Sequence, residues 1–193
     1  MPELSVLCMA RIGQIVENPV SGERMVFRQT AATTGGRLLA FELFLSPHGH
    51  VPASHVHPLQ EERFTVVTGR MRFRRGIRTL VAGPGETVVV PPRTIHRFTN
   101  AGGGEARVLV EVRPALRMED LLETSAALAV EGRTFPNGLP LPLDLALFLR
   151  EFDRELRIPL VPHALANAAL VPGARLAERL GLGIRYEGRR LAA

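Results

Sequence analysis

The chain has 193 residues, 46% of them apolar and 22% charged, a composition typical of one globular domain or of one domain with an appendage. It excludes disorder as the main state of the chain. All 24 basic residues are arginine, and with 19 acidic residues they give a net charge of +5. The absence of lysine excludes catalysis through a Schiff base, and the single cysteine, Cys8, excludes an intrachain disulfide or a redox-active cysteine pair.

The amino-terminal segment does not have the pattern of a secretory signal. Its apolar stretch has no basic residues before it and stops at Arg11, so we expect a cytoplasmic protein. The longest uncharged run, residues 158–174, is too short for a bilayer span and contains three prolines. We therefore expect no transmembrane helix.

Between residues 23 and 113 the sequence consists of short runs rich in Val, Leu, Phe and Thr, each ending near glycine or proline. Such runs at regular spacing predict strands of a sandwich or barrel. The expected strands are residues 25–30, 37–45, 64–68, 71–74, 77–81, 87–90 and 106–112.

After Pro114 the apolar residues recur at helical spacing. This pattern predicts helices over residues 118–131, 143–157, 163–170 and 174–180, with Pro142 suited to a helix start. We expect a mainly β domain over residues 1–116, including amino-terminal strands, followed by an α-helical extension over residues 117–193.

The helical extension is predicted to pack on the barrel, on a second subunit or on another hydrophobic surface. Its 10 arginines are balanced by 10 acidic residues, which argues against a DNA-reading helix, and nucleic acid is not an expected partner. The apolar stripe and arginines of residues 143–157 would also suit a membrane surface, although a buried helical face is the preferred interpretation.

Five of the six histidines lie between residues 48 and 96. His55 and His57 are two apart, so on a strand both side chains point to the same face. With Glu62 and His96 they offer three imidazole nitrogens and one carboxylate, a ligand set for one divalent ion such as Fe, Mn, Ni, Cu, Co or Zn. In an octahedral complex this set leaves two positions open for substrate, water or O₂. The alternative is a barrel whose histidines bind no metal.

These residues stand in two motifs that resemble those of the cupin superfamily. The first cupin motif is Gly, five residues, His-x-His, three or four residues, Glu, six residues, Gly. In this sequence it is represented by Gly49, His55, His57, Glu62 and Gly69. Glu61 competes with Glu62 as a ligand, but only Glu62 has the six-residue spacing to Gly69, and Glu61 would point to the opposite face.

The second cupin motif is Gly, five residues, Pro-x-Gly, two residues, His, three residues, Asn. It is represented by Gly85, Pro91, Arg93, His96 and Asn100, with Arg93 in place of the turn glycine. This departure concerns the shape of the turn, because all four ligand positions are filled. The resemblance covers about residues 20–115 and implies a single double-stranded β-helix, or jelly-roll barrel, with His55, His57, Glu62 and His96 as metal ligands.

Four further residues are candidates for the pocket. Phe98 has the same parity as His96 if the strand continues, and Met71 and Phe73 occupy the apolar face of a strand whose other face carries Arg70, Arg72 and Arg74. We expect the arginines to face outward, because three buried guanidinium groups without partners would be too costly. His50, like His48, lies on a loop, where it is either solvated or an acid–base group of the pocket.

Two functions from different classes fit these residues: a metal-dependent enzyme acting on a small organic molecule, and a non-catalytic or regulatory barrel that binds such a molecule. An isomerase needs a positioned general base, and the β domain offers only histidines and glutamates for that role, namely His48, His50, Glu42, Glu61 and Glu111. A dioxygenase-like reaction demands less of the protein and is favoured. We also expect a homodimer, since small barrels have sheet edges that a second subunit can cover.

Overall fold

The structure is a computed structural model that describes residues 10–159, 163–182, 185–186 and 189–190. Within these described residues, the β domain has nine strands: β1 (Ile15–Asn18), β2 (Glu23–Gln29), β3 (Leu39–Leu45), β4 (Glu61–Thr68), β5 (Met71–Arg75), β6 (Arg78–Ala82), β7 (Thr87–Val90), β8 (His96–Asn100) and β9 (Ala106–Arg113). The helices are α1 (Ala31–Thr34), α2 (Met118–Val130), α3 (Pro142–Glu151) and α4 (His163–Arg179). A short hairpin, β10 (Arg185–Tyr186) and β11 (Arg189–Arg190), lies after α4.

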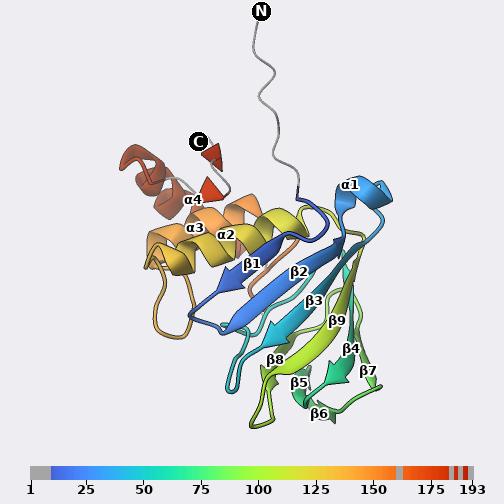
Figure 1. Ribbon diagram of the computed structural model, residues 1–193. Helices are drawn as coiled ribbons and strands as arrows, with labels where there is room; N and C mark the ends of the chain where they lie inside the picture. The colour runs from blue at the N-terminus through green and yellow to red at the C-terminus, as the bar shows by residue number, and fades with distance from the viewer. Residues whose placement is uncertain (1–9, 160–162, 183–184, 187–188, 191–193) are drawn as a thin grey trace, which may run out of the picture.

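The strands of the β domain form two antiparallel sheets, as a jelly roll requires. The larger sheet has the order β1-β2-β3-β9-β4-β7 and the smaller has the order β6-β5-β8. Phe64 of β4 meets Phe73 of β5 and Phe98 of β8 at ring-centroid distances of 5.2 and 5.3 Å, so one aromatic cluster joins the two sheets. The mainly β jelly roll followed by helices confirms the fold class expected from the sequence (Figure 1).

Alternation along β5 separates the core from the surface. Met71 and Phe73 are buried, whereas Arg72 and Arg74 are exposed, as the sequence pattern predicts. The sequence alone leaves open whether the chain continues as a strand after His96. It does continue, as β8, which pairs with β5. Its inward residues, His96, Phe98 and Asn100, are all buried.

Two residues of the second motif serve the turns of the barrel. Asn100 donates from its side chain to the carbonyl groups of Leu45, Ser46 and Gly104, at 2.8 to 3.0 Å, and so ties the end of β3 to the loop between β8 and β9. Arg93, at the position where the motif has glycine, adopts a φ of 64°, in the left-handed region that favours glycine. The departure in sequence is therefore accommodated by a strained arginine, and the turn itself is kept.

The third helix is shorter than expected. The sequence predicts a helix over residues 143–157, but α3 ends at Glu151. The chain then turns so that Phe152 and Glu155 become buried and Arg157 pairs with Val56 through backbone hydrogen bonds. These tertiary interactions outweigh the helical propensity of the segment.

The two short helices predicted over residues 163–170 and 174–180 are instead a single helix, α4, which continues through Pro172. Proline removes one helical hydrogen bond, a cost that packing can offset. Here α4 packs on α3 (Figure 1), and Ala174 and Ala177 are fully buried. A Cβ atom on Gly173 would lie 3.3 Å from Cβ of Ala146, so the small residues after the proline permit this close packing.

Helix α2 packs beside β1 at the edge of the larger sheet, with α3 next to it (Figure 1). Helix α2 of the extension thus packs on the barrel. Among the described residues, no helix has both the length and the apolar character needed to cross a bilayer.

Candidate metal centre and pocket

Three histidines and one glutamate converge inside the barrel. His55 and His57 lie on the segment before β4, Glu62 is the second residue of β4, and His96 is the first residue of β8. Their ligand atoms all lie within 4.8 Å of one another. Reciprocal backbone hydrogen bonds of 3.0 Å between His55 and His96 hold the two motifs together. A divalent ion requires this kind of convergence from residues distant in sequence.

Each of the three imidazole rings is oriented by a backbone carbonyl. The Nδ1 atoms of His55, His57 and His96 lie 3.0, 2.5 and 3.0 Å from the carbonyl oxygens of Ala53, Glu155 and Thr94, respectively. A carbonyl oxygen only accepts hydrogen bonds, so each Nδ1 donates to its carbonyl and each Nε2 is the ring atom left to face a cation. Such carbonyl partners are the usual outer-shell support of metal-binding histidines.

The carboxylate of Glu62 lies among the imidazole Nε2 atoms. Its Oε2 is 2.8 Å from Nε2 of His96 and 3.3 Å from Nε2 of His57. Nε2 of His57 is buried and has no properly directed hydrogen bond among the described residues. A buried imidazole nitrogen without a hydrogen-bond partner, next to a carboxylate, fits a metal ion better than it fits an apolar core.

Burial and the neighbouring ionisable groups shift the pKa values of three cluster residues. Burial, together with the neighbouring His57 and His96, lowers the pKa of His55 to about 3, so its imidazole is neutral and able to bind a cation. Burial alone would raise the pKa of Glu62, but the adjacent imidazoles of His57 and His96 hold it well below the ordinary value. The same carboxylate raises the pKa of His57 despite the opposing effect of burial.

The helical extension takes part in this centre. Val56 donates to the carbonyl of Arg157 at 3.1 Å, and the amide of Arg157 donates to the carbonyl of Val56 at 2.9 Å. The segment that carries His55 and His57 therefore pairs with β8 on one side and with residue 157 on the other. The carbonyl of Glu155, two residues earlier, is thereby brought to His57.

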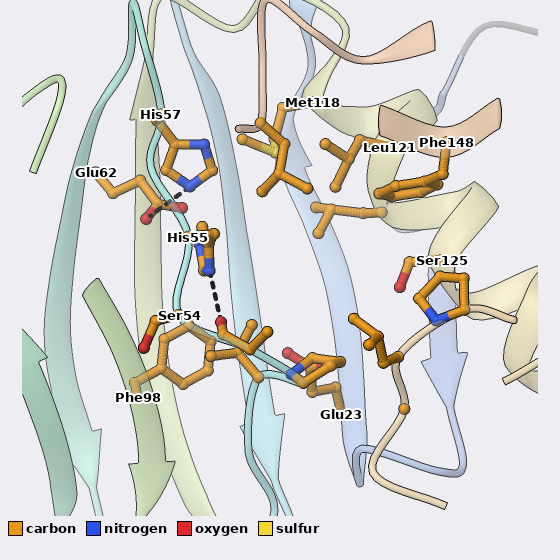
Figure 2. Close-up of a pocket in the computed structure, with 18 of the residues that line it drawn as sticks. Glu23, Ser54, His55, His57, Glu62, Phe98, Met118, Leu121, Ser125 and Phe148 are labelled. Atoms are coloured by element: carbon orange, nitrogen blue, oxygen red, sulfur yellow. Dashed lines mark hydrogen bonds and ion pairs between the residues drawn. The ribbon is translucent and has the colours of Figure 1, made fainter. Parts of the chain in front are cut away.

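A cavity of about 350 Å³ lies beside the cluster, between the barrel and the helices. His55, His57 and Glu62 form part of its wall, so an ion held by them would face the cavity. Figure 2 shows these residues on one side and residues of α2 and α3 on the other. The helices contribute Met118, Leu121, Leu122, Ser125, Leu145, Phe148 and Leu149.

The family model of the cupin domain matches residues 42–112 of this chain, which contain both motifs and all four cluster residues. The match identifies residues 42–112 as a cupin domain. No curated protein matches the chain.

Among solved structures, the cupin domain is similar to an RmlC-like cupin from Shewanella frigidimarina, with 16% sequence identity and a TM-score of 0.48 over 55% of this chain and 88% of that chain. It is also similar to KdgF from Halomonas sp., at 15% identity and a TM-score of 0.46 over 55% and 91% of the two chains. A predicted oxalate decarboxylase from Thermotoga maritima has 16% identity and a TM-score of 0.47, over 52% and 90%.

The four pocket candidates in the cupin domain occupy different places. Phe98 lines the cavity, whereas Met71 and Phe73 lie in the core between the sheets and do not reach it. Their strand, β5, points its apolar face at Phe64 and Phe98, which cover it on the cavity side. His50 is also absent from the wall.

The loop histidine His50 is held elsewhere by backbone groups. Its ring nitrogens lie 3.3 and 3.4 Å from the carbonyl oxygens of His48 and Asn137. Glu61, the competing ligand, has its carboxylate 3.8 Å from Arg63 on the outer side of β4. Neither residue joins the cluster.

Two parts of the cavity wall were not singled out from the sequence. One face of α2 carries Met118, Leu121, Leu122 and Ser125. Their helical spacing can be recognised in the sequence, but the surface that they cover cannot. Glu23 also lines the cavity. Its parity with Met25 and Phe27 on β2 is a signal that could have placed its side chain inside the barrel.

Proposed function

We propose that this cupin is a metal-dependent enzyme that oxidises a small, largely apolar organic molecule with O₂. The observation that carries this proposal is that His55, His57 and Glu62 belong both to the cluster of ligand atoms and to the wall of the cavity. A ligand in the cavity is therefore in contact with the candidate metal position. This is the arrangement that metal-assisted chemistry on a bound molecule requires.

The four cluster residues supply ligands suited to iron, manganese, nickel, copper, cobalt or zinc. A redox-active ion of this group, when bound, would use its open positions to bind and activate O₂ and substrate. A dioxygenase places both oxygen atoms in the product and so needs no external reductant. The protein's own contribution is to orient the ligands and to keep water away with the apolar side chains of the barrel and helices.

The positions of the acid–base candidates favour oxidation over isomerisation. Glu42 bonds to Arg28 and Arg107, and Glu111 bonds to Arg113, all outside the cavity. Glu61 is also absent from the wall, as are His48 and His50. An isomerase would need a base next to the reacting carbon, and among the described residues that line the cavity the only carboxyl group outside the cluster is Glu23, which lies at the end away from the cluster.

The proposal can be tested by reconstituting the full chain with Fe(II), Mn(II), Cu(II) or Ni(II), finding compounds that stabilise the loaded protein against heat, and measuring O₂ uptake with each. Uptake that yields oxygenated product, and that is lost in His96→Ala, would support the enzyme. A compound that binds tightly beside the metal without O₂ uptake or chemical change, for every metal tried, would favour the alternative of a non-catalytic or regulatory cupin.

A further inference from the structure

A carboxyl group lies in the cavity away from the metal cluster. On β2 the side chains of Glu23, Met25 and Phe27 share one parity, and Met25 and Phe27 are buried in the barrel. Glu23 thus occupies an inward position that an apolar residue would ordinarily take. Its side chain lines the same cavity as His55 and His57 (Figure 2).

Glu23 has little to compensate its charge. The hydroxyl of Ser21 donates to its Oε2 at 2.5 Å, and the nearby His50 also lowers the pKa of Glu23. Among the described residues no arginine forms an ion pair with Glu23, in contrast to Glu42 with Arg28 and Arg107. Glu23 is half-buried as a residue, and burial of its carboxyl raises the pKa to about 7.

Glu23 and Glu62 lie far apart along the strands that border the cavity. In the sheet, Glu23 of β2 pairs with Leu45 of β3. Glu62 of β4 pairs with Val112 of β9, which in turn pairs with Leu39 of β3. Six positions along β3 correspond to about 20 Å of strand. Phe41 and Leu43, which lie between these two rows, both line the cavity, so its middle is apolar and its two ends are polar.

Once a divalent ion is bound, the charge at the cluster end of the cavity is opposite in sign to that of the Glu23 carboxylate. Glu62 is the single carboxylate among the four cluster residues, so the bound ion would retain a net positive charge. An anionic group on the ligand would be attracted to that end. The carboxylate of Glu23 instead attracts a hydrogen-bond donor or a cation at the other end.

We propose that the ligand of this site is an elongated molecule with an apolar middle, a carboxylate at the end that meets the metal, and an amine or hydroxyl at the end that donates to Glu23. This assignment rests on the proposed function for its metal-binding end. It assigns Glu23 as a specificity-determining residue of the pocket. Both an amine and a hydroxyl donate a hydrogen bond to Glu23 at this end, and the experiment distinguishes between them.

The test uses the full chain loaded with zinc, which binds ligands without oxidative turnover. Titration calorimetry compares medium-chain ω-aminoalkanoates, ω-hydroxyalkanoates and unsubstituted alkanoates of the same length. The wild-type protein is expected to bind at least one of the two substituted series about 10–100-fold more tightly than the plain acids, the range of a hydrogen bond to a charged group.

Two variants identify the donor. Glu23→Leu should abolish the preference in either case. Glu23→Gln should abolish a preference for the amine, because the positive charge loses its partner, but should retain much of a preference for the hydroxyl, because the amide oxygen still accepts. Glu17→Gln, on the exposed face of β1, is the matched control and should behave as wild type. Thermal unfolding confirms that each variant is folded.

The outcomes separate this inference from the proposed function. A zinc-loaded wild-type chain that binds substituted and plain acids equally, or none of them, overturns the role of Glu23 while the metal centre stands. A preference that survives Glu23→Leu also overturns it. A chain that takes up no metal at all overturns the proposed function, and this inference with it.

Discussion

The backbone carbonyl of Glu155 accepts a hydrogen bond from Nδ1 of His57 at 2.5 Å, across 98 residues of sequence. The helical extension therefore orients one of the four candidate ligands. The carbonyl is kept in place by the paired backbones of Val56 and Arg157 and by the Glu155 side chain, which accepts from the amide of Arg117 at 3.1 Å. Cluster and extension form one unit.

This relationship predicts that breaking the backbone pair weakens metal binding. Arg157→Pro removes the amide that donates to Val56 and should reduce metal affinity about 10–100-fold, the usual effect of losing outer-shell support. Arg157→Ala loses the same side chain but keeps the amide, and should bind metal nearly as wild type does. Competition with a chromophoric chelator measures both. Equal affinities in the two variants would contradict the prediction.

A second prediction concerns the turn of the second motif. Arg93 has a φ of 64°, which costs a non-glycine residue about 1–2 kcal/mol. Arg93→Gly should therefore raise the free energy of unfolding by up to about 1 kcal/mol, since the greater entropy of unfolded glycine offsets part of the gain. Urea unfolding of Arg93→Gly and Arg93→Ala tests this. An equal increase in the free energy of unfolding in both variants would show that the effect comes from loss of the arginine side chain and not from relief of backbone strain.

Much of the fold follows from local pattern. The alternation in β5 and the spacing of the two motifs predict a jelly roll. The same motifs identify four candidate metal ligands, His55, His57, Glu62 and His96. Each of these inferences depends on neighbours within a few residues, or on a spacing that a known family shares. The structure adds the distances among the four residues, which no local pattern contains.

The rest depends on contacts between distant segments. Residues 152–157 have a helical pattern, but the pairing of Arg157 with Val56 draws the chain out of the helix. Likewise α4 continues through Pro172 because it packs on α3. Met71 and Phe73 were correctly placed on an inward face, but whether an inward side chain meets core or cavity depends on what covers it from the other sheet.

The core position of Phe73 gives a third prediction. This residue is 1% exposed and contacts Phe64 and Phe98 without lining the cavity. Phe73→Ala should cost about 3–5 kcal/mol of stability, the usual range for a large core residue. Metal stoichiometry in the folded variant should be unchanged. Denaturant unfolding and metal analysis test the two parts, and loss of metal from folded Phe73→Ala would show that Phe73 supports the centre.

A fourth prediction concerns the pH dependence of stability. The pKa of Glu23 is raised from 4.5 to about 7 by burial, an effect that Ser21 and His50 oppose. Between these values the unfolded chain loses the proton that the folded chain keeps, so this group lowers stability as pH rises and its penalty is complete above pH 7. Glu23→Gln lacks the penalty.

The difference in unfolding free energy between Glu23→Gln and wild type should therefore grow from pH 4 to pH 8, in favour of the variant, by about 1–3 kcal/mol. Urea unfolding at both pH values, in the presence of a chelator so that metal loading is the same, gives this difference. A constant difference across the range would show that the Glu23 carboxyl is not desolvated in the folded protein.

The most direct test of the central claim is the metal content per chain, by mass spectrometry, of protein purified without chelator or nickel affinity resin. The structure predicts close to one equivalent of a divalent transition metal in the wild type, its loss in His96→Ala, and its retention in His50→Ala, whose imidazole lies outside the cluster. A wild-type chain that carries no metal and takes up none when it is added, or a His96→Ala variant that binds one equivalent with unchanged affinity, would contradict the proposed centre.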